Sequence, residues 1–131
     1  MKVKNWVKFL LPNGLENMSN PNGGQHKFTL VYGDLAVGVL TYAEGEWAYA
    51  YTSQFQAQSA IRPLLDFPDI TRTYTSSDLW PFFALRIPGL GQPAVQKIIS
   101  EKKIEESNIV DLLKEFGKKT IANPFELHPQ S

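Results

Sequence analysis

The chain has 131 residues, of which 43% are hydrophobic and 20% charged, a composition typical of a single globular domain rather than of a disordered chain. Thirteen Lys and Arg residues balance thirteen Asp and Glu residues, so no net charge favours direct binding to nucleic acid or anionic lipid. Cysteine is absent, and His26 and His128 are the only histidines, so the sequence offers neither a metal-binding pattern nor an acid–base pair. We therefore expect a protein that is not an enzyme and requires no cofactor.

Residues 1–25 are predicted to form an N-terminal extension that precedes one domain, residues 26–131. The first dozen residues contain lysines and an apolar run of the wrong length and interruption for a signal peptide or a membrane span. A cytoplasmic protein without membrane contact is the resulting expectation. Residues 13–25 are rich in Asn, Gly, Ser and Pro, as turns and linkers are. The extension is either a frayed tail or a short element docked on the domain or on a partner.

Three strands are predicted at the start of the domain, over residues 27–32, 35–42 and 46–51. Turn residues separate them, so we expect a three-stranded antiparallel meander. Trp47, Tyr49 and Tyr51 alternate along the third strand and share one of its faces. This aromatic stripe is typical either of a nucleic-acid stacking platform or of a core under a helical layer. The strand has no basic residue, which favours the core.

The next residues are predicted to have less regular structure. Residues 53–60 suit one or two turns of helix. Residues 61–68 are apolar and bounded by proline, which fits an edge strand or an extended crossing. Residues 69–75 are predicted to form a surface loop that carries Arg72 and Tyr74.

An aromatic segment, residues 76–89, has the ends of a short helix and an unusual density of aromatic side chains. Ser76, Ser77 and Asp78 are typical of a helix start, and Asp78 is expected to cap the helix rather than to contact a partner. Trp80 is expected at the helix entrance because Pro81 disfavours helical geometry in the residue before it. Trp80 either contacts a partner or belongs to the core, and some of the apolar surface of this segment is expected to face a partner.

Two further helices are predicted after this segment. Pro93 suits the first turn of one, and Val95, Ile98 and Ile99 form its inward face. Asn108 is predicted to cap the second. Its apolar stripe is expected at Ile109, Leu112, Leu113 and Phe116, with Gly117 as its end. A last strand is expected within residues 121–127. The order of elements predicts an α+β domain, with an antiparallel sheet (the meander plus a possible C-terminal strand) and helices on one side.

Four short motifs, in this order, resemble the N-terminal subdomain of HipA-type serine/threonine kinase toxins. They are Val37-Gly38-Val39-Leu40, Arg62-Pro63-Leu64, the run from Phe82-Phe83 to Leu85-Arg86-Ile87-Pro88-Gly89, and residues 111–119. The resemblance covers residues 28–127, although residues 120–124 depart from the small-residue run usual in the family. The chain contains no glycine-rich nucleotide loop or catalytic Asp-Asn pair. A free-standing subdomain of this kind is similar to the HipS antitoxins of bacterial three-component HipB-HipS-HipT systems.

The resemblance implies an antitoxin that binds and neutralises a separate HipT-like serine/threonine kinase toxin by occluding its active-site cleft. The alternative is a non-inhibitory tether that links the kinase to a DNA-binding HipB-like protein. Arg86 is expected to pair either with a kinase carboxylate or with an acidic residue of this chain, and Arg72 and Tyr74 to lie at the rim of the interface. The expected kinase-interface residues are Trp80, Asp78, Phe83, Arg86, Arg72 and Tyr74.

Overall fold

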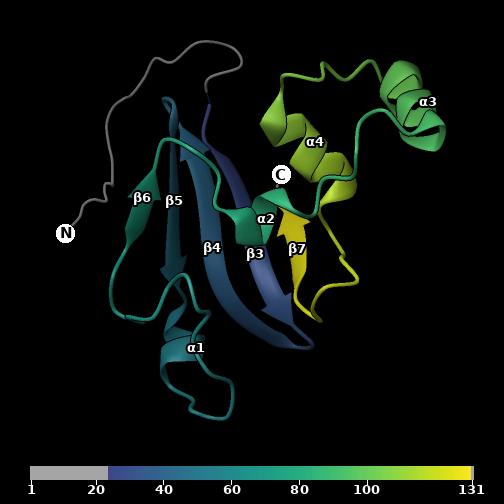
Figure 1. Cartoon of the computed structure of the whole chain (residues 1–131). Coiled ribbons are helices and arrows are strands. Elements are labelled where there is room, and N and C mark those ends of the chain that lie inside the picture. The colour runs from purple at the N-terminus through teal and green to yellow at the C-terminus, as the bar shows by residue number, and fades with distance from the viewer. Residues whose placement is uncertain (1–23, 131) are drawn as a thin grey trace.

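The computed structural model describes residues 24–130, which form one antiparallel sheet with short helices beside it (Figure 1). The predicted extension, residues 1–25, therefore lies almost wholly outside the described residues. The elements, in chain order, are β3 (His26–Tyr32), β4 (Leu35–Ala43), β5 (Glu46–Tyr51), α1 (Ser53–Gln56), β6 (Tyr74–Ser76), α2 (Pro81–Ala84), α3 (Pro93–Lys102), α4 (Ile109–Phe116) and β7 (Glu126–Pro129).

The five strands are arranged in the order β6-β5-β4-β3-β7, and all neighbours are antiparallel. The predicted meander is confirmed as β3, β4 and β5. Tight turns join these strands, and Gly33 and Gly45 adopt the positive φ angles of 59° and 79° that the turns require. The C-terminal strand β7 pairs with β3, so the last strand returns to the first.

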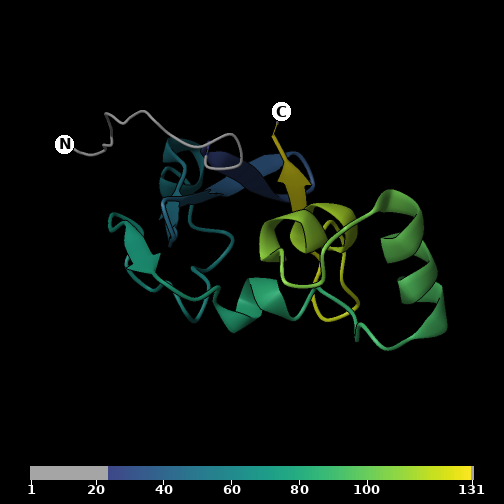
Figure 2. The same ribbon diagram turned by 90° about the horizontal axis from the view of Figure 1, so that it is seen from above.

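One face of the sheet carries the core, because alternate side chains of each strand point to the same side. Figure 2 shows α2, α3 and α4 together on that side of the sheet, which confirms the predicted α+β architecture. The predicted aromatic stripe on β5 is part of this core. The buried side chains that the strands contribute are Phe28, Leu30, Val37, Leu40, Trp47, Tyr49, Tyr51 and Leu127.

Gly38 allows Tyr49 to lie across the neighbouring strand. A Cβ atom at position 38 would lie 2.4 Å from the Tyr49 Cζ atom, closer than any side chain tolerates. The two strands pair with Gly38 opposite Tyr51 and Leu40 opposite Tyr49, so the ring of Tyr49 crosses β4 diagonally. The glycine of the Val37–Leu40 motif thus makes room for the largest fully buried side chain of the core.

Of the two alternatives predicted for residues 61–68, the structure has the crossing, whereas the surface loop predicted for residues 69–75 was wrong at its end, where a strand begins at Tyr74. Residues 61–68 form an extended crossing without strand pairing, and the edge strand is β6, within the predicted loop. The prolines at 63 and 68 lack the N–H group that a ladder needs, which explains why the crossing does not pair. Tyr74–Ser76 contains no proline and pairs with β5.

The two later helices begin as predicted, with Pro93 in the first turn of α3 and the Asn108 side chain accepting the Asp111 N–H at 3.0 Å. The predicted stripe of α4 needs one correction. Ile109 is 43% exposed, and Val110 is buried in its place. The sheet lies beside one flank of this short helix and α3 beside another, so its buried face is wider than a single stripe.

The last strand starts later than predicted, at Glu126 rather than Ile121, and Ile121 is fully exposed. Residues 118–125 form the loop between α4 and β7. Among residues 24–130, no helix is long and apolar enough to cross a membrane.

Candidate protein-binding site

The edge strand β6 ends at Ser76, the first residue of the aromatic segment, and so attaches the segment to the sheet. Ser76 pairs with Trp47 and Tyr74 with Tyr49, which fixes the start of the segment at the edge of the sheet. The Ser76 hydroxyl oxygen then accepts the Asp78 N–H at 3.1 Å, a local turn that directs the chain away from the strand. The segment therefore runs from an edge strand, through a side-chain turn, into a helix.

The predicted capping role of Asp78 was wrong. Helix α2 is a single turn, Pro81–Ala84, and Trp80 is its N-cap residue without a side-chain cap. As predicted, Pro81 holds the preceding residue Trp80 in an extended conformation, with ψ at 147°, and so places it at the helix entrance. Because Pro81 has no N–H to satisfy, this helix start has less need of a capping carboxylate. Asp78 lies two residues before the cap, and its side chain is exposed.

Trp80 and Phe83 diverge from this short helix to different environments. Phe83 is fully buried and packs near Tyr49, with ring centroids 5.6 Å apart. Trp80 is half-buried, and its ring meets Phe67 edge to face at 5.0 Å. Trp80 therefore packs against the core and keeps part of its surface exposed, and its contact with a partner stays a prediction.

Phe67 connects Trp80 with the two rim residues of the prediction. Its ring is fully buried and lies 5.0 Å from the ring of Tyr74 as well as from that of Trp80. The guanidinium of the exposed Arg72 lies over the Tyr74 ring, 5.0 Å from the ring centroid. The structure thus brings Arg72, Tyr74 and Trp80 together around one buried ring.

Phe67 itself is positioned by Tyr51 of the core stripe. The Tyr51 hydroxyl donates to the Phe67 carbonyl at 2.6 Å and accepts the Leu64 N–H at 2.8 Å. Burial raises the pKa of Tyr51 to about 12, although the bond from Leu64 opposes this shift. A neutral Tyr51 hydroxyl therefore fastens the extended crossing to β5.

The turn before β6 is organised by Asp69. Its carboxylate accepts the Thr71 hydroxyl at 2.8 Å and the Thr71 N–H at 3.0 Å, and these bonds lower the pKa of Asp69. The Asp69 N–H donates to the Tyr74 hydroxyl at 2.8 Å. These contacts orient the loop that carries Arg72.

Arg86 has a structural role that sequence reasoning missed. The side chain is 5% exposed, and its guanidinium donates to three carbonyls, those of Gly117 (3.2 Å), Lys118 (3.3 Å) and Phe125 (3.0 Å), and to the Asn123 side-chain oxygen (3.2 Å). Within residues 24–130 no carboxylate pairs with Arg86, so the predicted ion pair was wrong for this part of the chain, and burial lowers the pKa of the guanidinium. Three of the four acceptors are backbone carbonyls of residues distant in the chain, which no sequence pattern reveals.

Leu85 is a surface residue that the sequence analysis did not single out. It follows α2 directly and is 78% exposed, next to the fully buried Phe83 and the nearly buried Arg86. The available signal was the length of the apolar run, because a single helical turn cannot bury every side chain of Pro81–Leu85. We use the term display surface for the exposed and half-buried side chains along this stretch of chain, namely Arg72, Tyr74, Asp78, Trp80 and Leu85.

The display surface contains no arrangement suited to catalysis. Its ionisable side chains are one exposed arginine, one exposed carboxylate and a tyrosine whose hydroxyl accepts a backbone N–H. Within residues 24–130, no group of three or more His, Cys, Asp or Glu side chains could hold a metal ion. A half-buried tryptophan in the same stretch of chain as an exposed arginine and an exposed leucine is instead typical of a protein–protein contact.

The comparisons with known proteins show the family and the fold of this chain. Residues 29–122, more than half of the chain, match the family model described as the HipA N-terminal domain. A solved structure described as the N-terminal domain of HipA toxin is similar with a TM-score of 0.54 and 15% sequence identity, covering 89% of this chain and 98% of that one. This second likeness shows a shared fold. A search of curated proteins finds no significant match.

Proposed function

Since the chain belongs to the HipA N-terminal domain family, we propose that it is a HipS-like antitoxin that neutralises a separate HipT-like serine/threonine kinase toxin. It does so by docking on the kinase and occluding the active-site cleft. The matched family model is that of an N-terminal domain and not of a kinase catalytic domain, which supports a binding role. Occlusion requires a complementary surface and no cofactor.

The observation that carries this proposal is the position of Trp80. Its ring is supported from behind by Phe67 at 5.0 Å, and its backbone is fixed by Pro81 at the helix entrance. A tryptophan held in this way loses little conformational entropy on binding, so its apolar area contributes efficiently to affinity. Trp80 is the side chain we assign to the kinase cleft.

The other residues expected at the kinase interface divide into two groups. Asp78, Arg72 and Tyr74 lie on the display surface, where charged and aromatic groups give an interface its rim. Phe83 and Arg86 are buried and support the interface from inside the domain. We add Leu85 to the first group, because this exposed leucine at the other end of α2 adds apolar area for a partner.

The test is phosphorylation by a HipA-type kinase that lacks this domain and is encoded beside it, measured with increasing amounts of the full chain. Three variants are compared with wild type after their folding is confirmed by circular dichroism: Trp80→Ala, Leu85→Ala and Ile121→Ala. Ile121 is the matched control for Leu85, because both are exposed aliphatic residues but Ile121 lies on the loop before β7. We expect Trp80→Ala to raise the concentration for half-inhibition by at least about tenfold, Leu85→Ala by less, and Ile121→Ala not at all.

The outcomes separate the competing functions. Complex formation without inhibition by wild type rejects occlusion and leaves a tether between the kinase and a HipB-like DNA-binding protein. Absence of any complex rejects the proposal altogether. Full inhibition by a folded Trp80→Ala variant keeps the antitoxin but removes Trp80 from the blocking contact.

A further inference from the structure

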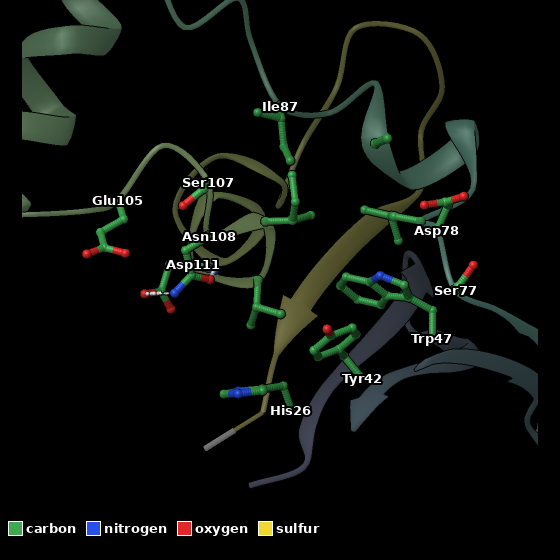
Figure 3. Close-up of a pocket in the computed structure, with 14 residues that line it drawn as sticks. His26, Tyr42, Trp47, Ser77, Asp78, Ile87, Glu105, Ser107, Asn108 and Asp111 are labelled. Atoms are coloured by element: carbon green, nitrogen blue, oxygen red, sulfur yellow. Dashed lines mark hydrogen bonds between the residues drawn. The ribbon is translucent and has the colours of Figure 1, made fainter. Parts of the chain in front are cut away.

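A second surface feature, distinct from Trp80, is a groove of about 900 Å³ on the helix side of the sheet. Figure 3 shows it between the start of α4 and the turn that precedes α2, with Tyr42 and Trp47 of the sheet at its base. The two rings contact each other with centroids 4.6 Å apart. Leu79, Ile87 and the 43% exposed Ile109 add apolar surface, so the groove has the character of a binding site for side chains.

The charge around this groove has one predominant sign. Asp78, Glu105 and Asp111 line it, and none of its lining residues within residues 24–130 is Lys or Arg. At one end lies His26, whose Nδ1 atom is 3.2 Å from the Lys114 Nζ atom. Apart from that end, the groove offers carboxylates around aromatic and aliphatic surface. The ligand that fits it presents aromatic side chains flanked by cations.

The first twelve residues of this chain have that chemistry. They contain Lys2, Lys4 and Lys8 around Trp6 and Phe9, and no acidic residue occurs before Glu16. The described part of the chain starts at Gly24, two residues before His26, which itself lines the groove. The twelve residues from 13 to 24 span up to roughly 40 Å when extended, so residues 1–12 can reach any part of the groove.

We propose that residues 1–12 bind in this groove of their own chain, with Trp6 or Phe9 against the Tyr42–Trp47 base and the lysines beside the carboxylates. Closure of the connecting loop costs little, because its entropy rises only slowly with length. Trp80 is not among the lining residues, so this docking leaves Trp80 uncovered, although it covers Asp78, which we placed at the rim of the kinase contact. The experiments below measure docking in the isolated chain and therefore test it independently of kinase inhibition.

The first experiment compares amide chemical shifts of the ¹⁵N-labelled full chain with those of the Trp6→Ala/Phe9→Ala double variant. We expect the differences to concentrate at residues 77–79 and 105–111, and to shrink when salt screens the charge pairs. The matched control is Leu15→Ala, which removes an apolar side chain outside residues 1–12 and is expected to leave the groove amides unchanged. Differences confined to residues outside the groove, such as Thr29, Val39 and Thr41 of the sheet, or no differences beyond the mutated sites, overturn the proposal.

The second experiment reverses charge in the groove. Glu105→Lys is expected to reproduce the groove shifts of the double variant, whereas Glu101→Lys, the same change on exposed α3, is expected not to. Equal effects of the two substitutions contradict a specific site. Dilution separates the possible occupants: groove shifts that disappear at low protein concentration identify a second copy as the occupant and overturn docking within one chain.

Discussion

Trp80 and Phe83 are both aromatic, lie three residues apart and belong to one helical turn, yet they have opposite roles in the structure. Phe83 is fully buried and followed by Arg86, whose guanidinium makes four hydrogen bonds to residues 117–125. Trp80 is half-buried and reaches the core through one edge-to-face contact with Phe67. The comparison teaches that the buried side chains Phe83 and Arg86 fix the segment, while Trp80 and Leu85 of the same segment keep exposed surface. Stability and binding should therefore respond to different substitutions.

The largest expected effect is loss of stability on Phe83→Ala. Removing a fully buried phenylalanine is expected to lower the free energy of unfolding by about 4 kcal/mol, because it leaves a cavity among Tyr49, Phe67 and Phe82. Urea denaturation measures this difference. Leu85→Ala, two residues away and 78% exposed, is the control and should change stability by less than about 0.5 kcal/mol. Comparable losses in the two variants would contradict the conclusion that Phe83 holds the segment on the core and that Leu85 does not.

Arg86→Ala is expected to be the next most damaging substitution. It leaves the carbonyls of Gly117, Lys118 and Phe125 without this donor, which should lower the free energy of unfolding by about 3 kcal/mol. Arg86→Lys should recover only part of the loss, because an ammonium group cannot reproduce the planar fork of donors. Hydrogen exchange locates the effect, and faster exchange should appear around residues 117–127. If Arg86→Ala is as stable as wild type, Arg86 does not hold this loop in place.

Tyr51→Phe tests whether the Tyr51 hydroxyl holds Phe67, whose ring packs against Trp80. Loss of the hydroxyl that bonds Phe67 and Leu64 should lower the free energy of unfolding by about 2 kcal/mol at neutral pH. Tyr51 has a pKa of about 12 in the folded protein and of about 10 in the unfolded chain. Its contribution to stability is therefore complete below about pH 10, where the hydroxyl is protonated in both states. That contribution declines between pH 10 and about 12. Urea titrations across this range should show a shallower alkaline decline in Tyr51→Phe, and an unchanged pH slope would contradict the assignment.

The smallest effect is expected for Arg72→Ala, which acts on the display surface alone. The exposed guanidinium lies over Tyr74 at 5.0 Å, and its loss should change stability by less than about 0.5 kcal/mol. In the kinase assay it should weaken inhibition only a few-fold, as rim residues do. A loss of inhibition as large as that of Trp80→Ala would place Arg72 at the centre of the contact instead.

The sequence by itself determined the elements that follow from local pattern. Alternation along residues 46–51 predicted the buried face of β5, and Asn108 and Pro93 predicted where two helices begin. Pro81 likewise predicted the extended geometry of Trp80. These features depend on neighbours within a few residues, so a single sequence contains the information for them.

Only the tertiary structure decided the roles of side chains whose partners are distant in the chain. Arg86 bonds carbonyls 31 and 39 positions away, and any residue type has a carbonyl to offer, so no sequence signal marks these acceptors. The edge position of β6 and the exposure of Ile109 likewise depend on which elements pack beside them. Three-dimensional packing therefore determined which side chains of the aromatic segment are buried and which stay exposed.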